Sequence, residues 1–103
     1  MEVTVPLFAD SLAPGYTAED IRLVYKACYG NDIVSYCGEL GGGGFVSAHE
    51  LAGKDSMKIG VLGNDERILL VAVYDNLGKG ASGAAVEILN MILGADETRG
   101  LNI

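Results

Sequence analysis

The sequence has few of the residues that build metal centres and disulfide frameworks. It contains one histidine, His49, and two cysteines, Cys28 and Cys37, which lie nine residues apart without a CxxC pair. Since a zinc site needs several ligands at characteristic spacings, this composition argues against a metal site. Each cysteine follows a pattern of apolar residues. We expect both to be small buried hydrophobic side chains in a reduced protein.

Positive charge is also scarce. Seven Lys and Arg residues stand against 14 Asp and Glu residues, which gives a net charge of −7. This balance argues against nucleic acid and against an anionic membrane surface as partners. No apolar run approaches the ~18 residues that a membrane-spanning helix requires. The N-terminus lacks the basic and hydrophobic segments of a signal peptide, so we expect a cytoplasmic protein.

Apolar residues, in contrast, are abundant. They make up 50% of the 103 residues, which is a high share for a small monomer of one domain, residues 1–103. Two interpretations remain open at this point. The chain is either a rather hydrophobic globular domain or a piece of a larger protein, with faces that pack against its other parts.

The order of the predicted elements is β-α-β-β-β-α. Thr17 and Asp20 form a weak capping box at the start of the first helix, and Gly30 is placed to end that helix. The expected strands cover residues 1–8, 33–37, 56–62 and 67–74, and the second helix covers residues 81–93. This order predicts an α+β fold, with a mostly antiparallel or mixed sheet and its helices on one face. Because Pro6 cannot donate a backbone hydrogen bond, the first strand either lies at a sheet edge or ends near this residue.

Apolar periodicity predicts which faces are buried. The strand 67–74 lacks alternation, so we expect both of its faces to be covered, one by a helix and the other by something outside this chain. The expected buried stripe of the first helix is Ile21, Val24, Tyr25 and Cys28. The expected stripe of the second helix is Ala85, Val86, Leu89, Ile92 and Leu93.

Two further segments lack a periodic pattern. The four glycines at 41–44 are followed by Phe45 and not by the Lys-Ser/Thr of a phosphate-binding loop, so we interpret them as a mobile loop. Residues 96–103 form a tail, which we expect to be loose.

The most suggestive stretch is the turn after the strand 67–74. There the polar side chains of Asn76 and Lys79 lie between a strand and a helix, and Gly78 and Gly80 let the backbone bend. A strand, turn and helix in this order leave polar groups and free backbone N–H groups at one edge of a sheet.

This stretch also carries a family resemblance. The run DNLGKGASGAAV, the following LNMILGADETRGL and the opening MEVTVPLFADSL resemble N-acetyl-gamma-glutamyl-phosphate reductases, enzymes of arginine biosynthesis. The Asp-Asn turn is shared with aspartate-semialdehyde dehydrogenases, and a looser version occurs in glyceraldehyde-3-phosphate dehydrogenases. The resemblance implies the C-terminal part of a glyceraldehyde-3-phosphate-dehydrogenase-like catalytic and dimerisation domain.

The family reduces an N-acetylglutamyl phosphate to its semialdehyde with NADPH, through a cysteine and a histidine. Those two residues lie in Ser-Asn-Pro-Gly-Cys and His-Arg-His contexts, and neither context occurs here. The resemblance therefore gives no catalytic role to Cys28, Cys37 or His49. It implies that this chain alone is inactive, and that its partners are a nucleotide-binding domain, a second copy in a homo-oligomer and an acyl-phosphate substrate.

One role does transfer through the resemblance. Asn76 matches the asparagine that hydrogen-bonds the nicotinamide carboxamide of NADP, and an amide both donates and accepts as that contact requires. Gly78, Lys79 and Gly80 match the same motif and are the other expected cofactor-binding residues, although Lys79 has the alternative of pairing with a carboxylate. Asp75 shapes the turn.

The sequence departs from the family at two places. Gly53-Lys54-Asp55 replaces a Gly-Thr-Asn or Gly-Ser-Asn, and Glu87 replaces a frequent Gln. Two alternatives also remain. One is a fragment of an aspartate-semialdehyde dehydrogenase, against which Gly78 weighs because those enzymes tend to have Arg there. The other is a stand-alone dimerisation module without catalysis.

Overall fold

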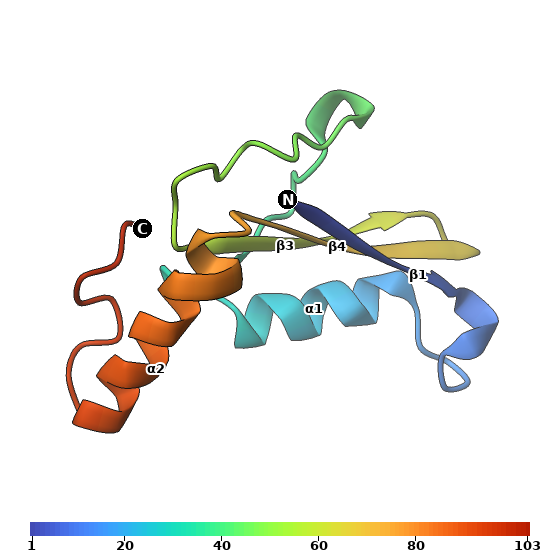
Figure 1. Cartoon of the computed structure of the whole chain (residues 1–103). Coiled ribbons are helices and arrows are strands. Elements are labelled where there is room, and N and C mark those ends of the chain that lie inside the picture. The colour runs from blue at the N-terminus through green and yellow to red at the C-terminus, as the bar shows by residue number, and fades with distance from the viewer.

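A computed structural model describes residues 1–103, with the surroundings of Gly42 left out. The strands are β1 (Glu2–Phe8), β2 (Val34–Tyr36), β3 (Met57–Gly63) and β4 (Arg67–Tyr74), and the helices are α1 (Ala18–Cys28) and α2 (Gly83–Leu93) (Figure 1). This order confirms the predicted α+β fold and its β-α-β-β-β-α sequence of elements. No helix of the described chain is both long and apolar enough to cross a membrane.

The four strands form one mixed sheet in the order β1-β4-β3-β2. β4 runs antiparallel to both β1 and β3, whereas β2 runs parallel to β3. The β3–β4 hairpin closes at Asn64, whose Oδ1 accepts the N–H groups of Glu66 and Arg67 at 2.9 Å each. Strand β1 lies at the edge of the sheet, as Pro6 predicts, and β4 is its centre.

Helix α1 covers one face of the sheet (Figure 1). Its start is fixed by the Asp20 carboxylate, which accepts the Thr17 N–H at 2.7 Å. Ala18 is buried with Val61 and Ile68 of the sheet, and Ile21 and Tyr25 pack against them. The residues that α1 packs against the sheet therefore lie within one narrow arc of the helix.

The predicted stripe of α1 is wrong at two positions. Val24 and Cys28 are exposed, because Val24 lies beside the arc that contains Ala18 and Tyr25, and Cys28 is the last residue of the helix. Cys28 is therefore not the buried hydrophobic residue that its apolar neighbours indicate. Cys37 is half-buried and packs against Leu40 and its neighbours on the opposite face of the sheet.

That opposite face is covered by the long connection between β2 and β3. Leu40 and Leu51 of this connection form a buried cluster with Val71 and Val73 of β4. Both faces of β4 are thus covered, as its unbroken apolar run predicts, but the second cover comes from this chain and not from something outside it. The glycine run belongs to this connection, and Gly41 lies close to Val46 and Leu62.

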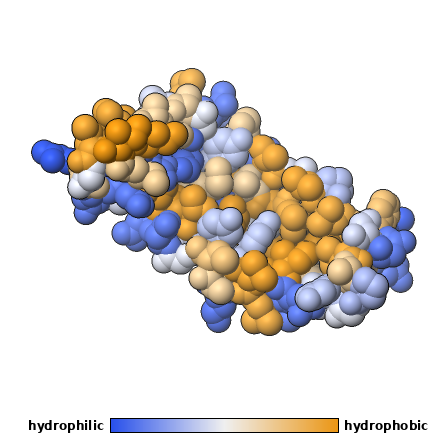
Figure 2. Space-filling model, turned by 90° about the horizontal axis from the view of Figure 1, so that it is seen from below, coloured by the Kyte–Doolittle hydropathy of each residue, from blue (hydrophilic) through white to orange (hydrophobic). Residues whose placement is uncertain are grey.

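Helix α2 begins below one end of the sheet and extends beyond it (Figure 1). Only Gly83 and Asn90 are buried along it. The predicted stripe is wrong for four of its five positions, since Ala85, Leu89, Ile92 and Leu93 are exposed and Val86 is half-buried. The physical reason is position, because a helix that leaves the sheet has no core to meet with its apolar face. Apolar side chains of α2 are consequently exposed, and apolar residues appear in orange on the surface in Figure 2.

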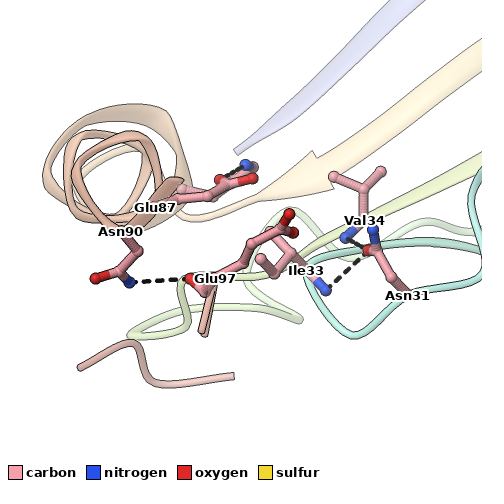
Figure 3. Close-up of polar contacts among 7 residues, drawn as sticks. Asn31, Ile33, Val34, Glu87, Asn90 and Glu97 are labelled. Atoms are coloured by element: carbon pink, nitrogen blue, oxygen red, sulfur yellow. Dashed lines mark hydrogen bonds and ion pairs between the residues drawn. The ribbon is translucent and has the colours of Figure 1, made fainter. Parts of the chain in front are cut away.

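The tail after α2 turns back along the molecule. The buried side chain of Asn90 donates its Nδ2 hydrogens to the carbonyl oxygens of Glu97 at 3.1 Å (Figure 3) and Arg99 at 2.8 Å. The Ala95 N–H donates to the Asn90 carbonyl at 2.9 Å. The prediction of a loose tail is therefore wrong, because the buried amide of Asn90 holds two carbonyl groups of the tail.

Candidate functional site

The turn after β4 is organised by the carboxylate of Asp75. Its Oδ2 accepts the N–H of Gly53 at 2.7 Å, and its Oδ1 accepts the N–H groups of Leu77 at 2.7 Å and Gly78 at 3.0 Å. These three donors, with Gly53 the strongest, hold the pKa of Asp75 below its ordinary value. The carboxylate thus fixes the turn to a loop more than 20 residues away in sequence.

A single π-helical turn, Gly78–Ser82, joins this turn to α2. The N–H of Gly80 donates to the Asp75 carbonyl at 3.0 Å, and the N–H of Ser82 donates to the Leu77 carbonyl at 3.1 Å. Such turns are rare and occur often at functional sites. The N–H groups of Leu77, Gly78, Gly80 and Ser82 all have partners inside the chain, so these four are not the free N–H groups that the sequence led us to expect here.

Two glycines of this region are required by close packing. A Cβ on Gly78 would lie 2.2 Å from the Lys54 carbonyl oxygen and 2.9 Å from Asp55 Oδ1, and one on Gly83 would lie 2.4 Å from the same Asp55 oxygen. Gly80 has more room, since its nearest neighbour would be the Tyr74 ring at 3.1 Å. Packing alone therefore accounts for the absence of a side chain at Gly78.

Lys79 forms an ion pair with Glu87 of α2. The two side chains are only 13% and 18% exposed, so the pair is largely shielded from water. This is the alternative that the sequence left open for Lys79, a carboxylate partner within the chain. Because its charge is balanced there, Lys79 is a poorer candidate for binding a phosphate than its place in the motif indicates.

Asn76 is different from its neighbours. It is exposed, it lies next to Leu77, which is 75% exposed, and its side-chain amide makes no hydrogen bond within the described part of the chain. The turn therefore fixes the backbone on both sides of Asn76 and leaves its amide available to another molecule. Of the four residues predicted to bind cofactor, Asn76 is the one whose side chain the fold does not use.

The structure also reveals two residues that the sequence patterns did not indicate, Asp55 and Asn102. The Asn102 N–H donates to Asp55 Oδ2 at 2.9 Å, and the Asn102 Nδ2 donates to the Gly53 carbonyl at 2.7 Å. No local pattern could have found this contact, because the two residues lie 47 positions apart. Within the described residues, no three His, Cys, Asp or Glu side chains gather closely enough to hold a metal ion.

Fold and turn together define an α+β domain with a four-stranded mixed sheet that presents an exposed amide from a carboxylate-fixed turn. Comparison of its sequence with curated proteins identifies relatives of this chain. The chain is 47% identical to N-acetyl-gamma-glutamyl-phosphate reductase of Allorhizobium ampelinum over 92% of its own length. It is 46% and 48% identical to the reductases of Sinorhizobium fredii and Rhizobium johnstonii, over 92% and 90% of its length. The chain is therefore homologous to the C-terminal part of N-acetyl-gamma-glutamyl-phosphate reductase.

The match has a defined extent. The chain spans about a third of the length of these curated relatives, 32% in each of the three. No family model matches the chain. The resemblance that rested on the Asp-Asn turn and its flanking segments is thus confirmed by identity over nearly the whole chain.

Proposed function

We propose that this chain is the C-terminal part of the catalytic and dimerisation domain of an NADPH-dependent reductase. The whole enzyme would convert N-acetyl-gamma-glutamyl phosphate to N-acetylglutamate semialdehyde in arginine biosynthesis. Identity of 46–48% to reductases of that name supports the assignment. The observation that carries a role for this chain is the exposed amide of Asn76 on a turn fixed by Asp75.

Asn76 fits a nicotinamide carboxamide on chemical grounds. A side-chain amide offers two N–H donors and a carbonyl acceptor, which complement the acceptor and donors of a second amide. The backbone beside it is already ordered by the Asp75 carboxylate, so little entropy is lost when the amide binds. When bound, the nicotinamide supplies the hydride, and Asn76 would hold its ring in one orientation. Correct orientation of this kind contributes strongly to rate.

Gly78, Lys79 and Gly80 would support the same cofactor site. The absence of a side chain at Gly78 lets residues 53–55, which we call the 53–55 loop, approach the turn. The Lys79–Glu87 ion pair holds the turn against α2. Their contribution would be to the shape of the turn, with Asn76 making the contact. The nucleophilic cysteine and the histidine of the reaction would come from the rest of the enzyme, and we expect the isolated chain to be inactive.

The apolar surface of α2 supports a role within a larger protein. Ile88, Leu89 and Ile92 are exposed, the last by 76%, and Met91 and Leu93 are exposed beside them. Large apolar side chains exposed together on one helix are typical of a surface that packs against another part of a protein. Because the relatives are about three times as long as this chain, we assign the cover of α2 to the remainder of the reductase, which includes its nucleotide-binding domain.

The test of the proposed function is Asn76→Ala in a complete reductase that carries this chain. Loss of one hydrogen-bonding group is expected to weaken NADPH binding or slow hydride transfer by about tenfold or more. Asn64→Ala is the matched control, because it removes an asparagine from the hairpin at the other end of β4. Unchanged cofactor affinity and rate in Asn76→Ala, with an intact fold, would remove Asn76 from the site.

The choice of substrate distinguishes the proposed reductase from the first alternative, an aspartate-semialdehyde dehydrogenase. The named relatives carry the name of the arginine-pathway enzyme, which favours N-acetylglutamyl phosphate over aspartyl phosphate as substrate. A complete enzyme that reduced only aspartyl phosphate would reverse this assignment. The exposed apolar side chains of α2 would equally form the contact surface of the second alternative, a dimerisation module. Sedimentation of the isolated chain tests it, since that module must remain a dimer on dilution.

A further inference from the structure

The C-terminal tail is bound to the 53–55 loop by hydrogen bonds in both directions. The Asp55 N–H donates to the Asn102 carbonyl at 2.7 Å, and the Asn102 N–H donates to the Asp55 carboxylate at 2.9 Å. The side chain of Asn102 adds a third bond, from Nδ2 to the Gly53 carbonyl at 2.7 Å. Lys54 Nζ donates to the Ile103 backbone oxygen at 3.2 Å. We call residues 101–103 the strap.

The same loop is bound to the turn that carries Asn76. The N–H of Gly53 donates to Asp75 Oδ2, while the other oxygen of that carboxylate holds the N–H groups of Leu77 and Gly78. A continuous set of hydrogen bonds thus runs from Asn102 through Gly53 and Asp75 to the residues on both sides of Asn76. Each member of the set is a direct contact of 3.0 Å or less.

Steric contact reinforces this connection. The backbone at Gly78 lies so close to the loop that a methyl group there would collide with the Lys54 carbonyl, and the Asp55 carboxylate lies equally close to Gly83. The 53–55 loop is therefore held between the strap on one side and the start of α2 on the other. Movement of the strap must be passed to the turn, because a close-packed loop has little room to absorb it.

We propose that Asp55 and Asn102 are positioning residues, which act through the 53–55 loop and Asp75 to fix the turn that presents Asn76. This inference rests on the proposed function, since it assigns to the strap the orientation of a nicotinamide-binding amide. The end of the chain then sets how firmly the amide is held, although neither residue touches the cofactor.

Amide hydrogen exchange, measured by NMR on the 103-residue chain, tests the proposal. Asp55→Ala and Asn102→Ala are each expected to speed exchange at the Leu77 and Gly78 amides by about tenfold. Asn102→Ala removes the first bond of the set, and Asp55→Ala removes the carboxylate that holds the Asn102 N–H in place. Exchange at the central amides of β4 is expected to change much less. Asp55→Asn is expected to restore slow exchange, since its side-chain oxygen still accepts the Asn102 N–H.

One control variant, Asn64→Ala, shows whether the effect is specific to the turn. Asn64→Ala removes two hydrogen bonds from the β3–β4 hairpin and is expected to leave Leu77 and Gly78 unchanged. If Asp55→Ala and Asn102→Ala speed exchange only at the amides of Asn102 and Asp55, or equally throughout β4, the positioning role is overturned. The first result would show an uncoupled strap, and the second a general loss of stability.

A titration with nicotinamide mononucleotide separates this proposal from the proposed function. In a complete reductase that carries this chain, it is expected to shift the side-chain amide signal of Asn76, with an apparent affinity that falls severalfold in Asn102→Ala. Equal affinities in the two enzymes would overturn the positioning role. Absence of any Asn76 shift in the unaltered enzyme would instead overturn the cofactor assignment, and the exchange data would still decide whether the strap fixes the turn.

Discussion

Substitution of Gly78 by alanine tests how tightly the 53–55 loop packs against the turn. The new Cβ would lie 2.2 Å from the Lys54 carbonyl oxygen, so the loop would have to retreat by about 1 Å to reach an ordinary carbon–oxygen separation. Overpacking of this kind costs about 1–3 kcal/mol. The φ of Gly78 is not positive, so alanine also restricts the unfolded chain and recovers about 0.4–1 kcal/mol. The net loss expected is roughly 1–2 kcal/mol.

Thermal denaturation followed by circular dichroism measures this loss as a fall in Tm of roughly 5–15 °C for a domain of this size. Gly30→Ala is the matched control, because nothing lies within 4 Å of a Cβ at that position and its φ is not positive. Its Tm is expected to stay the same or rise slightly. If Gly78→Ala has the same Tm as the unaltered chain, the 53–55 loop can move away from the new methyl group at little cost. Our account of a rigidly held turn would then be wrong.

Three other predictions follow from single contacts. The pKa of Asp75 is lowered on folding, so the stability that its carboxylate contributes is complete above its unfolded pKa of about 3.9 and is lost as the pH falls through its folded pKa. The stability of Asp75→Asn, measured in an acid titration, should therefore depend less on pH below about 4 than that of the unaltered chain. Asn90→Ala should destabilise the chain by about 1–3 kcal/mol in urea denaturation, because two carbonyls of the tail lose their donor, and an unchanged midpoint would contradict the role of Asn90. Cys28 should react with a thiol reagent in the native state faster than the half-buried Cys37, and equal rates would contradict their placement.

Local patterns were sufficient for the elements and for the centre of the sheet. The unbroken apolar run of β4 indicates a strand covered on both faces, and both covers exist. The edge position of β1 likewise agrees with Pro6, which cannot donate to a neighbouring strand. Each of these features is decided by residues that are close in sequence, or by a rule that holds at every sheet edge.

Features set by distant contacts could not be predicted in this way. Helix α2 has an apolar face, yet periodicity does not say that the helix leaves the sheet, so Leu89 and Ile92 were expected to be buried. The burial of Asn90 depends on the returning tail, which provides the carbonyl groups that its amide binds. The bonds from Asn102 to the 53–55 loop join segments almost 50 residues apart and leave no mark on local composition.

The turn itself shows how structure refines a motif. Asp75 is accounted for by three backbone N–H groups, Gly78 by the Lys54 carbonyl, and Lys79 by Glu87, so folding alone explains each of these residue types. Asn76 has no such partner in the described chain, and an exposed asparagine would tolerate many replacements if folding were its only role. The proposed recognition of a nicotinamide amide relies on this arrangement, in which the turn is fixed on both sides of one unused amide. The motif therefore separates into residues that hold the turn and one residue that the turn presents.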